Sequence, residues 1–215
     1  MSHTMAAMAA ALPLASGWSV HSLWMRRRIA AARRDPLTGL LTRDGFTEVA
    51  QRRLAHRPRA VCLIDLNKFK QINDTYGHAA GDAVIRAVGK RLSAWAVNNS
   101  AVVGRLGGDE FAAVAPAYSE NQLAETLSSL TAGLEQPVDV GGHLLTVSAA
   151  IGLVCFNARA DEADLSELLR VADEQMYRAK RGGAPWMKAP LGYAPERATV
   201  NGRRAGRQGA SEVAA

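Results

Sequence analysis

From residue 35 to residue 181, short apolar runs of strand length alternate with longer segments whose apolar residues recur at helical spacing. Residues 60–66 have the length and composition of a buried strand. Residues 78–96 carry Val84, Val88 and Leu92 on one face, which indicates an amphipathic helix. We expect further helices over residues 44–55, 123–134 and 165–176. Strands that alternate with helices predict an α/β domain, in which helices cover one sheet.

Two Gly-Gly pairs mark tight turns between predicted strands. Gly107 and Gly108 lie between apolar runs at residues 102–105 and 110–115, which is typical of a β-hairpin. Gly141-Gly142 separates a short strand near Val138 from a longer apolar run. We interpret that longer run as one continuous strand over residues 144–155.

The chain of 215 residues has room for one ordinary domain and short appendages. We place the domain at residues 35–183, after an N-terminal segment of residues 1–34. Residues 184–215 are rich in Gly, Ala, Pro and Arg without periodicity, so we expect a disordered tail.

The N-terminal segment has the charge pattern of a membrane anchor. Residues 5–24 contain no Asp, Glu, Lys or Arg, and the triplet Arg26-Arg27-Arg28 follows them. A segment of this length can cross a bilayer, and arginines after it favour a cytoplasmic location for the rest of the chain. We expect a single-pass protein of the inner, cytoplasmic membrane. Its weak hydropathy leaves a peripheral helix, or a leader on a cytoplasmic protein, as the alternatives.

Charge and cysteine content exclude two other classes of function. The chain has 26 Lys and Arg against 20 Asp and Glu, but many basic residues lie at 26–34 and 197–207, outside the predicted domain. No nucleic-acid recognition motif accompanies them, so we expect no nucleic acid as a partner. Cys62 and Cys155 lack CxxC spacing, which favours two buried thiols over a zinc or redox site.

Three acidic residues fall where predicted strands end or turn. Asp65 closes the strand over residues 60–66, and Asp109 and Glu110 follow the Gly107-Gly108 turn. If the two strands are neighbours, these carboxylates can bind Mg²⁺, which takes a few carboxylates together with phosphate oxygens. Taken singly, each acid is more typical of a solvated turn.

Residues that suit a nucleotide accompany the acids. Gly107 and Gly108 lack side chains, so a nucleotide can approach their backbone N–H groups. Asn73 and Asp82 offer the amide and carboxylate groups that can read a guanine edge, although singly they are typical of a turn and a helix start. Two cations complete the set, Lys70 and Lys180, each of which alone is typical of exposed surface.

The segment from Arg105 to Phe111 reads Arg-Leu-Gly-Gly-Asp-Glu-Phe, and in this the chain resembles the GGDEF family of diguanylate cyclases. Further blocks stand in that family's order and spacing, and the resemblance covers residues 35–181. The blocks are Asp-Pro-Leu-Thr-Gly-Leu at 35–40, Asp-Leu-Asn-Lys-Phe-Lys-Gln-Ile-Asn-Asp at 65–74, Gly-His and Gly-Asp within 77–82, and Ala-Asp with Met-Tyr-Arg-Ala-Lys within 172–180.

The resemblance implies a fold and an activity. The fold is a central five-stranded, mostly antiparallel sheet surrounded by helices, similar to nucleotidyl cyclases and polymerase palm domains. The activity is the joining of two GTP molecules into cyclic di-GMP with release of two pyrophosphates. Each domain binds one GTP, so a homodimer is needed, and two Mg²⁺ or Mn²⁺ ions assist at each active site.

The resemblance also implies roles for single residues. Asp65 and Asp109 are the metal ligands, the Leu66 carbonyl assists them, and Glu110 completes the metal site or assists deprotonation. The implied substrate contacts are Phe69 as the pocket wall, Asn73 and Asp82 as guanine readers, Lys70 and Lys180 on phosphates, and Gly107 and Gly108 as the turn that the nucleotide approaches.

The chain departs from the family pattern at three places. Residues 98–101 read Asn-Asn-Ser-Ala where product-inhibited members carry RxxD, and Gly183-Ala184-Pro185 replaces the usual Gly-Arg-Asn. Asn67 stands where aspartate is common. These departures leave three functions open: an active cyclase, a regulatory domain that binds GTP without turnover, and an interaction module without nucleotide.

Overall fold

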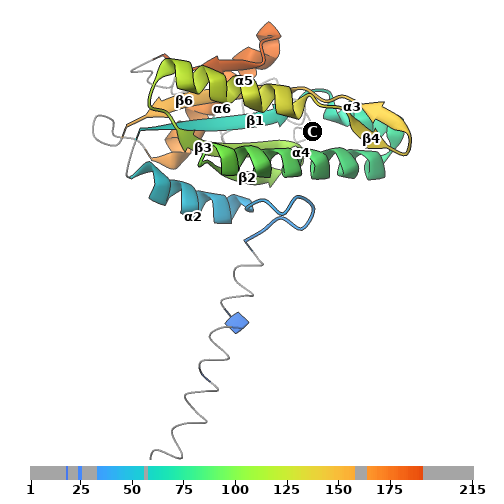
Figure 1. The fold of residues 1–215 in the computed structure, drawn as a ribbon, viewed down its shortest axis with the longest axis horizontal. Coiled ribbons are helices and arrows are strands. Elements are labelled where there is room, and N and C mark those ends of the chain that lie inside the picture. The colour runs from blue at the N-terminus through green and yellow to red at the C-terminus, as the bar shows by residue number, and fades with distance from the viewer. Residues whose placement is uncertain (1–17, 19–23, 26–32, 56–57, 158–163, 191–215) are drawn as a thin grey trace, which may run out of the picture.

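The computed structural model describes residues 18, 24–25, 33–55, 58–157 and 164–190. Five strands form the central sheet: β1 (Arg59–Leu66), β2 (Val102–Gly107), β3 (Glu110–Pro116), β6 (Ala149–Phe156) and β7 (Trp186–Lys188). They lie in the order β2-β3-β1-β6-β7 (Figure 1). All neighbours are antiparallel except β6 and β7, which are parallel. The predicted α/β fold with a five-stranded, mostly antiparallel sheet is confirmed.

Helices cover both faces of this sheet. Two of them, α4 (His78–Asn98) and α5 (Glu120–Leu134), pack on one face, while α2 (Arg43–Leu54) and α6 (Leu165–Gly182) pack on the other. The short helix α3 (Phe69–Tyr76) follows β1 and packs beside α4. The helices expected from hydrophobic periodicity are therefore present at α2, α4, α5 and α6.

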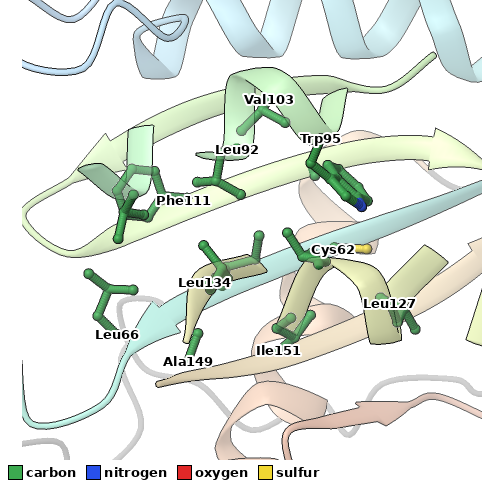
Figure 2. Close-up of a cluster of buried hydrophobic side chains, with 14 of the residues drawn as sticks. Cys62, Leu66, Leu92, Trp95, Val103, Phe111, Leu127, Leu134, Ala149 and Ile151 are labelled. Carbon is green, nitrogen blue, oxygen red and sulfur yellow. The ribbon is translucent and has the colours of Figure 1, made fainter. Parts of the chain in front are cut away.

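A separate hydrophobic core lies on each face. The core beneath α4 and α5 includes Phe111, Leu92, Leu127 and Ile151, all almost fully buried (Figure 2). Burial of an apolar side chain of this size contributes about 1.5–3 kcal/mol relative to exposure. Phe111 of the signature segment is thus a core residue.

Strand alternation decides which face the acidic end of β1 belongs to. Cys62 and Ile64 lie in the core beneath α4 and α5, whereas Val61 and Leu63 lie in the core beneath α2 and α6. Successive side chains of a strand point to opposite faces, so Asp65 belongs to the face that α6 covers.

Side-chain caps fix where three of the helices begin. Thr42 accepts a hydrogen bond from Gly45 N at the start of α2, Ser119 from Gln122 N at α5, and Asp164 from Glu167 N at α6. Such caps satisfy N–H groups that have no partner within the helix, and each contributes about 1 kcal/mol.

The continuous strand expected over residues 144–155 is wrong. The segment divides into β5 (His143–Leu145), which pairs with β4 (Val138–Val140) in a small separate sheet, and β6 of the main sheet. Residues 146–148 join them, and the Ser148 carbonyl accepts a hydrogen bond from Asn67 N at 2.8 Å. The apolar pattern continues across the break because Leu145, Val147 and Ala149 are all buried.

Two elements were not predicted, α3 and β7. The domain limit at residue 183 falls short of β7, whose backbone pairs with β6 from Ile151 to Leu153. The tail expected at residues 184–215 is therefore ordered at 186–188, and residues 191–215 lie outside the part of the chain that the structure describes.

The membrane-anchor prediction concerns residues 5–24, of which the structure describes only Trp18 and Trp24. No helix among the described residues is both long enough and apolar enough to cross a membrane.

Candidate functional site

The predicted acidic residues meet at one end of the sheet because β1 and β3 are neighbours. Asp65 lies opposite Glu110 in the strand register, and Leu66 N donates a hydrogen bond to Asp109 O at 3.3 Å. Asp65 is buried, with 7% of its surface exposed, while Asp109 and Glu110 are half-buried. The two strands are therefore neighbours, as the predicted metal site requires.

The glycine turn between β2 and β3 is held by Arg105. Gly108 has φ of +51°, a left-handed conformation that glycine adopts without the steric cost that a side chain brings. Arg105 donates from Nε and Nη2 to the Gly108 carbonyl at 3.0 and 2.8 Å. Its Nη1 donates to both carboxylate oxygens of Asp35 at 3.1 and 3.2 Å. One guanidinium therefore ties the signature turn to the segment before α2.

Asp35 is the centre of a local network. It accepts hydrogen bonds from Thr38 N at 2.9 Å and Thr38 Oγ1 at 2.7 Å, besides those from Arg105. Burial alone raises the pKa of the Asp35 carboxyl, but the bonds from Thr38 and Arg105 outweigh it, so this pKa lies below its ordinary value. No role was predicted for Asp35 or Arg105 from the sequence, although both residues stand in the motif blocks shared with the family that the chain resembles.

Helices α3 and α4 bring the predicted guanine readers together. A Cβ on Gly81 would lie 1.9 Å from Asn73 Oδ1 and 3.2 Å from Phe69 Cζ, so a larger residue there would displace the Asn73 side chain from this contact. Phe69 and Asn73 of α3 therefore lie against the first turn of α4, one residue from Asp82. Asp82 is exposed and forms an ion pair with Arg86 at 3.9 Å.

Of the two predicted phosphate-binding lysines, only Lys180 contacts the acidic residues. Lys180 Nζ, near the end of α6, lies 2.6 Å from Asp65 Oδ1. Lys70 is an exposed residue of α3. Lys68 caps α3 in a left-handed conformation with φ of +57°, which is uncommon for residues other than glycine.

A groove of about 1060 Å³ adjoins the acidic residues on the β6 side. It runs between α3, the β4–β5 hairpin and the end of α6, and in Figure 1 β4 lies beside α3 at this end of the sheet. Its lining includes Asn67, Lys68 and Lys180, but neither guanine reader nor the glycine turn. Of the predicted nucleotide-binding residues, Lys180 alone lines this groove.

The donors present fit a divalent cation that is bound together with phosphate. The candidate ligands are the carboxylates of Asp65 and Asp109 and the Leu66 carbonyl. Among the residues that the structure describes, no cluster of three or more His, Cys, Asp or Glu could hold a metal by itself. Mg²⁺ usually takes one or two protein carboxylates and completes its shell with phosphate oxygens and water, which suits this set. Asp65 already attracts a cationic group, the Lys180 ammonium.

Neither cysteine contributes reactive chemistry. Burial, together with the neighbouring Cys155, raises the pKa of the Cys62 thiol to about 12. Burial also raises the pKa of Cys155, which is half-buried rather than buried as predicted. Both thiols stay protonated at neutral pH, when they are poor nucleophiles and poor metal ligands.

Comparison with known proteins identifies the domain. The family described as diguanylate cyclase, GGDEF domain, matches residues 32–185. A 19.3 kDa protein of Streptomyces ambofaciens, described as uncharacterized, is 45% identical over 179 residues, covering 81% of this chain and 94% of that protein.

Two further similarities concern proteins of named activity or known structure. The diguanylate cyclase DosC of Escherichia coli is 36% identical over 156 residues, which cover 69% of this chain and 33% of DosC. This chain thus matches about a third of that longer relative. The crystal structure of the GGDEF domain of YfiN from Pseudomonas aeruginosa superposes with a TM-score of 0.64 at 33% identity, covering 72% of this chain and 99% of that one.

Proposed function

Since the chain belongs to the GGDEF family of diguanylate cyclases, we propose that it condenses two GTP molecules into cyclic di-GMP and two pyrophosphates. The observation that carries the proposal is the strand register that sets Asp65 opposite Glu110, with Asp109 beside Leu66. It gathers acids from two separate motifs at one end of the sheet, next to the glycine turn.

In this proposal the acidic residues act at the reacting groups, which are the 3′-hydroxyl and the attacked phosphate. Asp65, Asp109 and the Leu66 carbonyl would hold two Mg²⁺ or Mn²⁺ ions, and Glu110 would complete that shell or assist removal of the proton from the 3′-hydroxyl. Such ions would supply a lowered pKa for that hydroxyl and neutralisation of charge on the attacked phosphate and the leaving pyrophosphate.

The remaining residues bind and orient the nucleotide. Asn73 and Asp82 hydrogen-bond the guanine edge, and Phe69, which packs by Gly81, forms the wall of the pocket. Lys70 and Lys180 contact phosphates, while the turn at Gly107 and Gly108 leaves room for close approach. Such positioning supplies much of the rate in phosphoryl transfer.

One chain supplies half of the reaction centre. Each 3′-hydroxyl attacks the α-phosphate of the nucleotide on the other chain, so two chains must face each other about a twofold axis. The proposal therefore includes a homodimer during catalysis.

A specific observation favours a second candidate, a domain that binds GTP without turnover. Ala184 stands where the family usually has arginine, so one phosphate contact at the end of α6 is missing. Charge-assisted contacts from arginine to phosphate are strong, and their loss weakens substrate binding.

One experiment separates the candidates. The purified protein is incubated with GTP and Mg²⁺, and nucleotides are identified by mass spectrometry. Formation of cyclic di-GMP supports the cyclase. GTP that binds but is recovered unchanged supports the regulatory domain, and absence of both binding and product rejects both.

A further inference from the structure

Lys180, a predicted phosphate contact, forms an ion pair with Asp65, a predicted metal ligand. Lys180 Nζ lies 2.6 Å from Asp65 Oδ1, although 115 residues separate them in the chain. The Asp65 side chain is 10% exposed and the Lys180 side chain 45% exposed. One partner is thus fixed within the sheet, while the other is at the surface on a flexible stem.

The pair has a physical reason in the burial of Asp65. A carboxylate that is nearly buried is costly unless a cation or hydrogen bonds compensate it. Asp65 is the penultimate residue of β1, which is hydrogen-bonded on both sides, so it cannot turn to solvent without disturbing the sheet. The Lys180 ammonium supplies the compensating charge.

The same pair obstructs a metal ion. A divalent cation that binds the carboxylate oxygen must displace the ammonium or share the oxygen with it, and two cations at one carboxylate repel each other. A triphosphate offers Lys180 an alternative anionic partner within reach of its flexible side chain.

We propose that Lys180 is an exchangeable cation that neutralises Asp65 in the nucleotide-free protein and transfers to the triphosphate when nucleotide binds. Its release makes Asp65 available, so that metal and nucleotide bind together rather than independently. The triphosphate half of this exchange rests on the proposed function, whereas the competition between ammonium and metal does not.

The exchange predicts that loss of Lys180 changes metal affinity and nucleotide affinity in opposite directions. A purely structural lysine would not produce this result. Removal of the Lys180 charge should tighten metal binding in the absence of nucleotide and weaken nucleotide binding in the absence of metal. By linkage, the factor by which metal tightens nucleotide binding should also fall.

The first test measures Mn²⁺ binding to the nucleotide-free full chain by electron paramagnetic resonance of the free ion. Lys180→Met should bind Mn²⁺ about fivefold more tightly than wild type, the scale of a partly exposed ion pair. Lys68→Met is the matched control, because Lys68 lines the same groove but is not the partner of Asp65 in this pair. Equal Mn²⁺ affinity in all three proteins, or no Mn²⁺ binding by any of them, would overturn the proposal.

The second test measures the coupling with a non-reactive GTP analogue that has an α,β-methylene bridge. Its affinity is determined by calorimetry with and without Mn²⁺ for wild type, Lys180→Met and Lys180→Arg. The tightening by Mn²⁺ should be smaller in Lys180→Met by a similar factor and should be retained in Lys180→Arg. Unchanged coupling in Lys180→Met contradicts the exchange.

The two proposals fail in different ways. A protein that makes no cyclic di-GMP but shows the predicted Mn²⁺ affinities contradicts the cyclase and retains the competition at Asp65. A protein that makes cyclic di-GMP while Lys180→Met and wild type bind Mn²⁺ equally contradicts the exchange alone. Circular dichroism of each variant establishes that the compared proteins are folded.

Discussion

At the scale of single residues, the backbone and the side chain of Asp109 have separable functions. Its carbonyl accepts the hydrogen bond from Leu66 N that closes the end of the β1–β3 ladder, and any residue can provide that carbonyl. Its carboxylate is the proposed metal ligand. Asp109→Ala should therefore lower the rate of cyclic di-GMP synthesis roughly a hundredfold or more, since a metal supplies several kcal/mol of charge stabilisation.

The unfolding midpoint in urea should change little in Asp109→Ala. Glu125→Ala, at an exposed acid of α5, is the matched control and should keep the wild-type rate. Full activity of Asp109→Ala with Mg²⁺ would show that the metal ligands are elsewhere.

Asn73 carries the prediction on nucleotide choice. Its side chain lies against Gly81, while its backbone carbonyl separately accepts a hydrogen bond from Gly77 N at 2.9 Å. Asn73→Ala keeps that backbone hydrogen bond and removes the side chain's contact with Gly81 together with the proposed guanine contact. The preference for GTP over ATP, measured as a ratio of kcat/KM values, should fall about tenfold, as expected for loss of one hydrogen bond to the base. A wild-type enzyme that turns over both nucleotides equally contradicts the assignment.

At the scale of elements, the Asp35–Arg105 pair links the segment before α2 to the hairpin of β2 and β3. Because the pKa of Asp35 is lowered by folding, the unfolded chain binds its proton more readily. The stabilisation is therefore fully present above the ordinary pKa of 3.8 and is lost as pH falls through the lower, folded value.

Asp35→Asn should accordingly lower the free energy of unfolding by about 1 kcal/mol near neutral pH. The difference from wild type should shrink as the pH is lowered below the ordinary pKa. Urea titrations across this range measure it, with Asp44→Asn as a control at an exposed acid of α2. A difference that stays constant with pH would show that the charge of Asp35 does not stabilise the fold.

The long amphipathic elements could be predicted because their periodicity reflects burial. Leu123, Leu127, Leu130 and Leu134 of α5 are all buried, as the spacing indicates. The helix α3 has only eight residues and none that is fully buried; Phe69 and Ile72 pack against the core only in part, so its apolar stripe is too short to stand out. Strand β7 has three residues next to Pro185, and its pairing with β6 is a tertiary contact that local sequence does not encode.

The candidate site likewise has one part that local sequence predicts and another that depends on tertiary contacts. Register places Asp65 by Glu110, and this follows from two strands that each had an apolar pattern. The ion pair of Lys180 with Asp65 could not be predicted, because it depends on how α6 crosses the sheet. The clamp of Arg105 on Gly108 and Asp35 likewise joins segments whose proximity only the fold creates.

At the scale of the whole molecule, the absence of the RxxD motif at the end of α4 leads to a prediction on product inhibition. Residues 98–101 lack both the arginine and the aspartate of the RxxD motif, and Asn99 Nδ2 instead donates to Trp95 O at 2.9 Å. We expect that micromolar cyclic di-GMP causes no noncompetitive inhibition of initial rates. A noncompetitive curve would reveal a product site built from other residues.

Membrane attachment is tested by fractionation. If residues 5–24 are an anchor followed by cytoplasmic Arg26-Arg27-Arg28, the full chain should sediment with membranes. A fragment that starts near Ala31 should stay in the supernatant. Recovery of the full chain in the soluble fraction without detergent would contradict the anchor and favour the leader or a cytoplasmic protein.

The proposed cyclase activity is tested most directly by product analysis of a GTP reaction followed over a range of protein concentrations. We expect cyclic di-GMP with two pyrophosphates for each molecule formed. We also expect a rate that rises more than linearly with protein concentration, because two chains build one reaction centre. GTP that stays intact in the presence of Mg²⁺ and folded protein would contradict it.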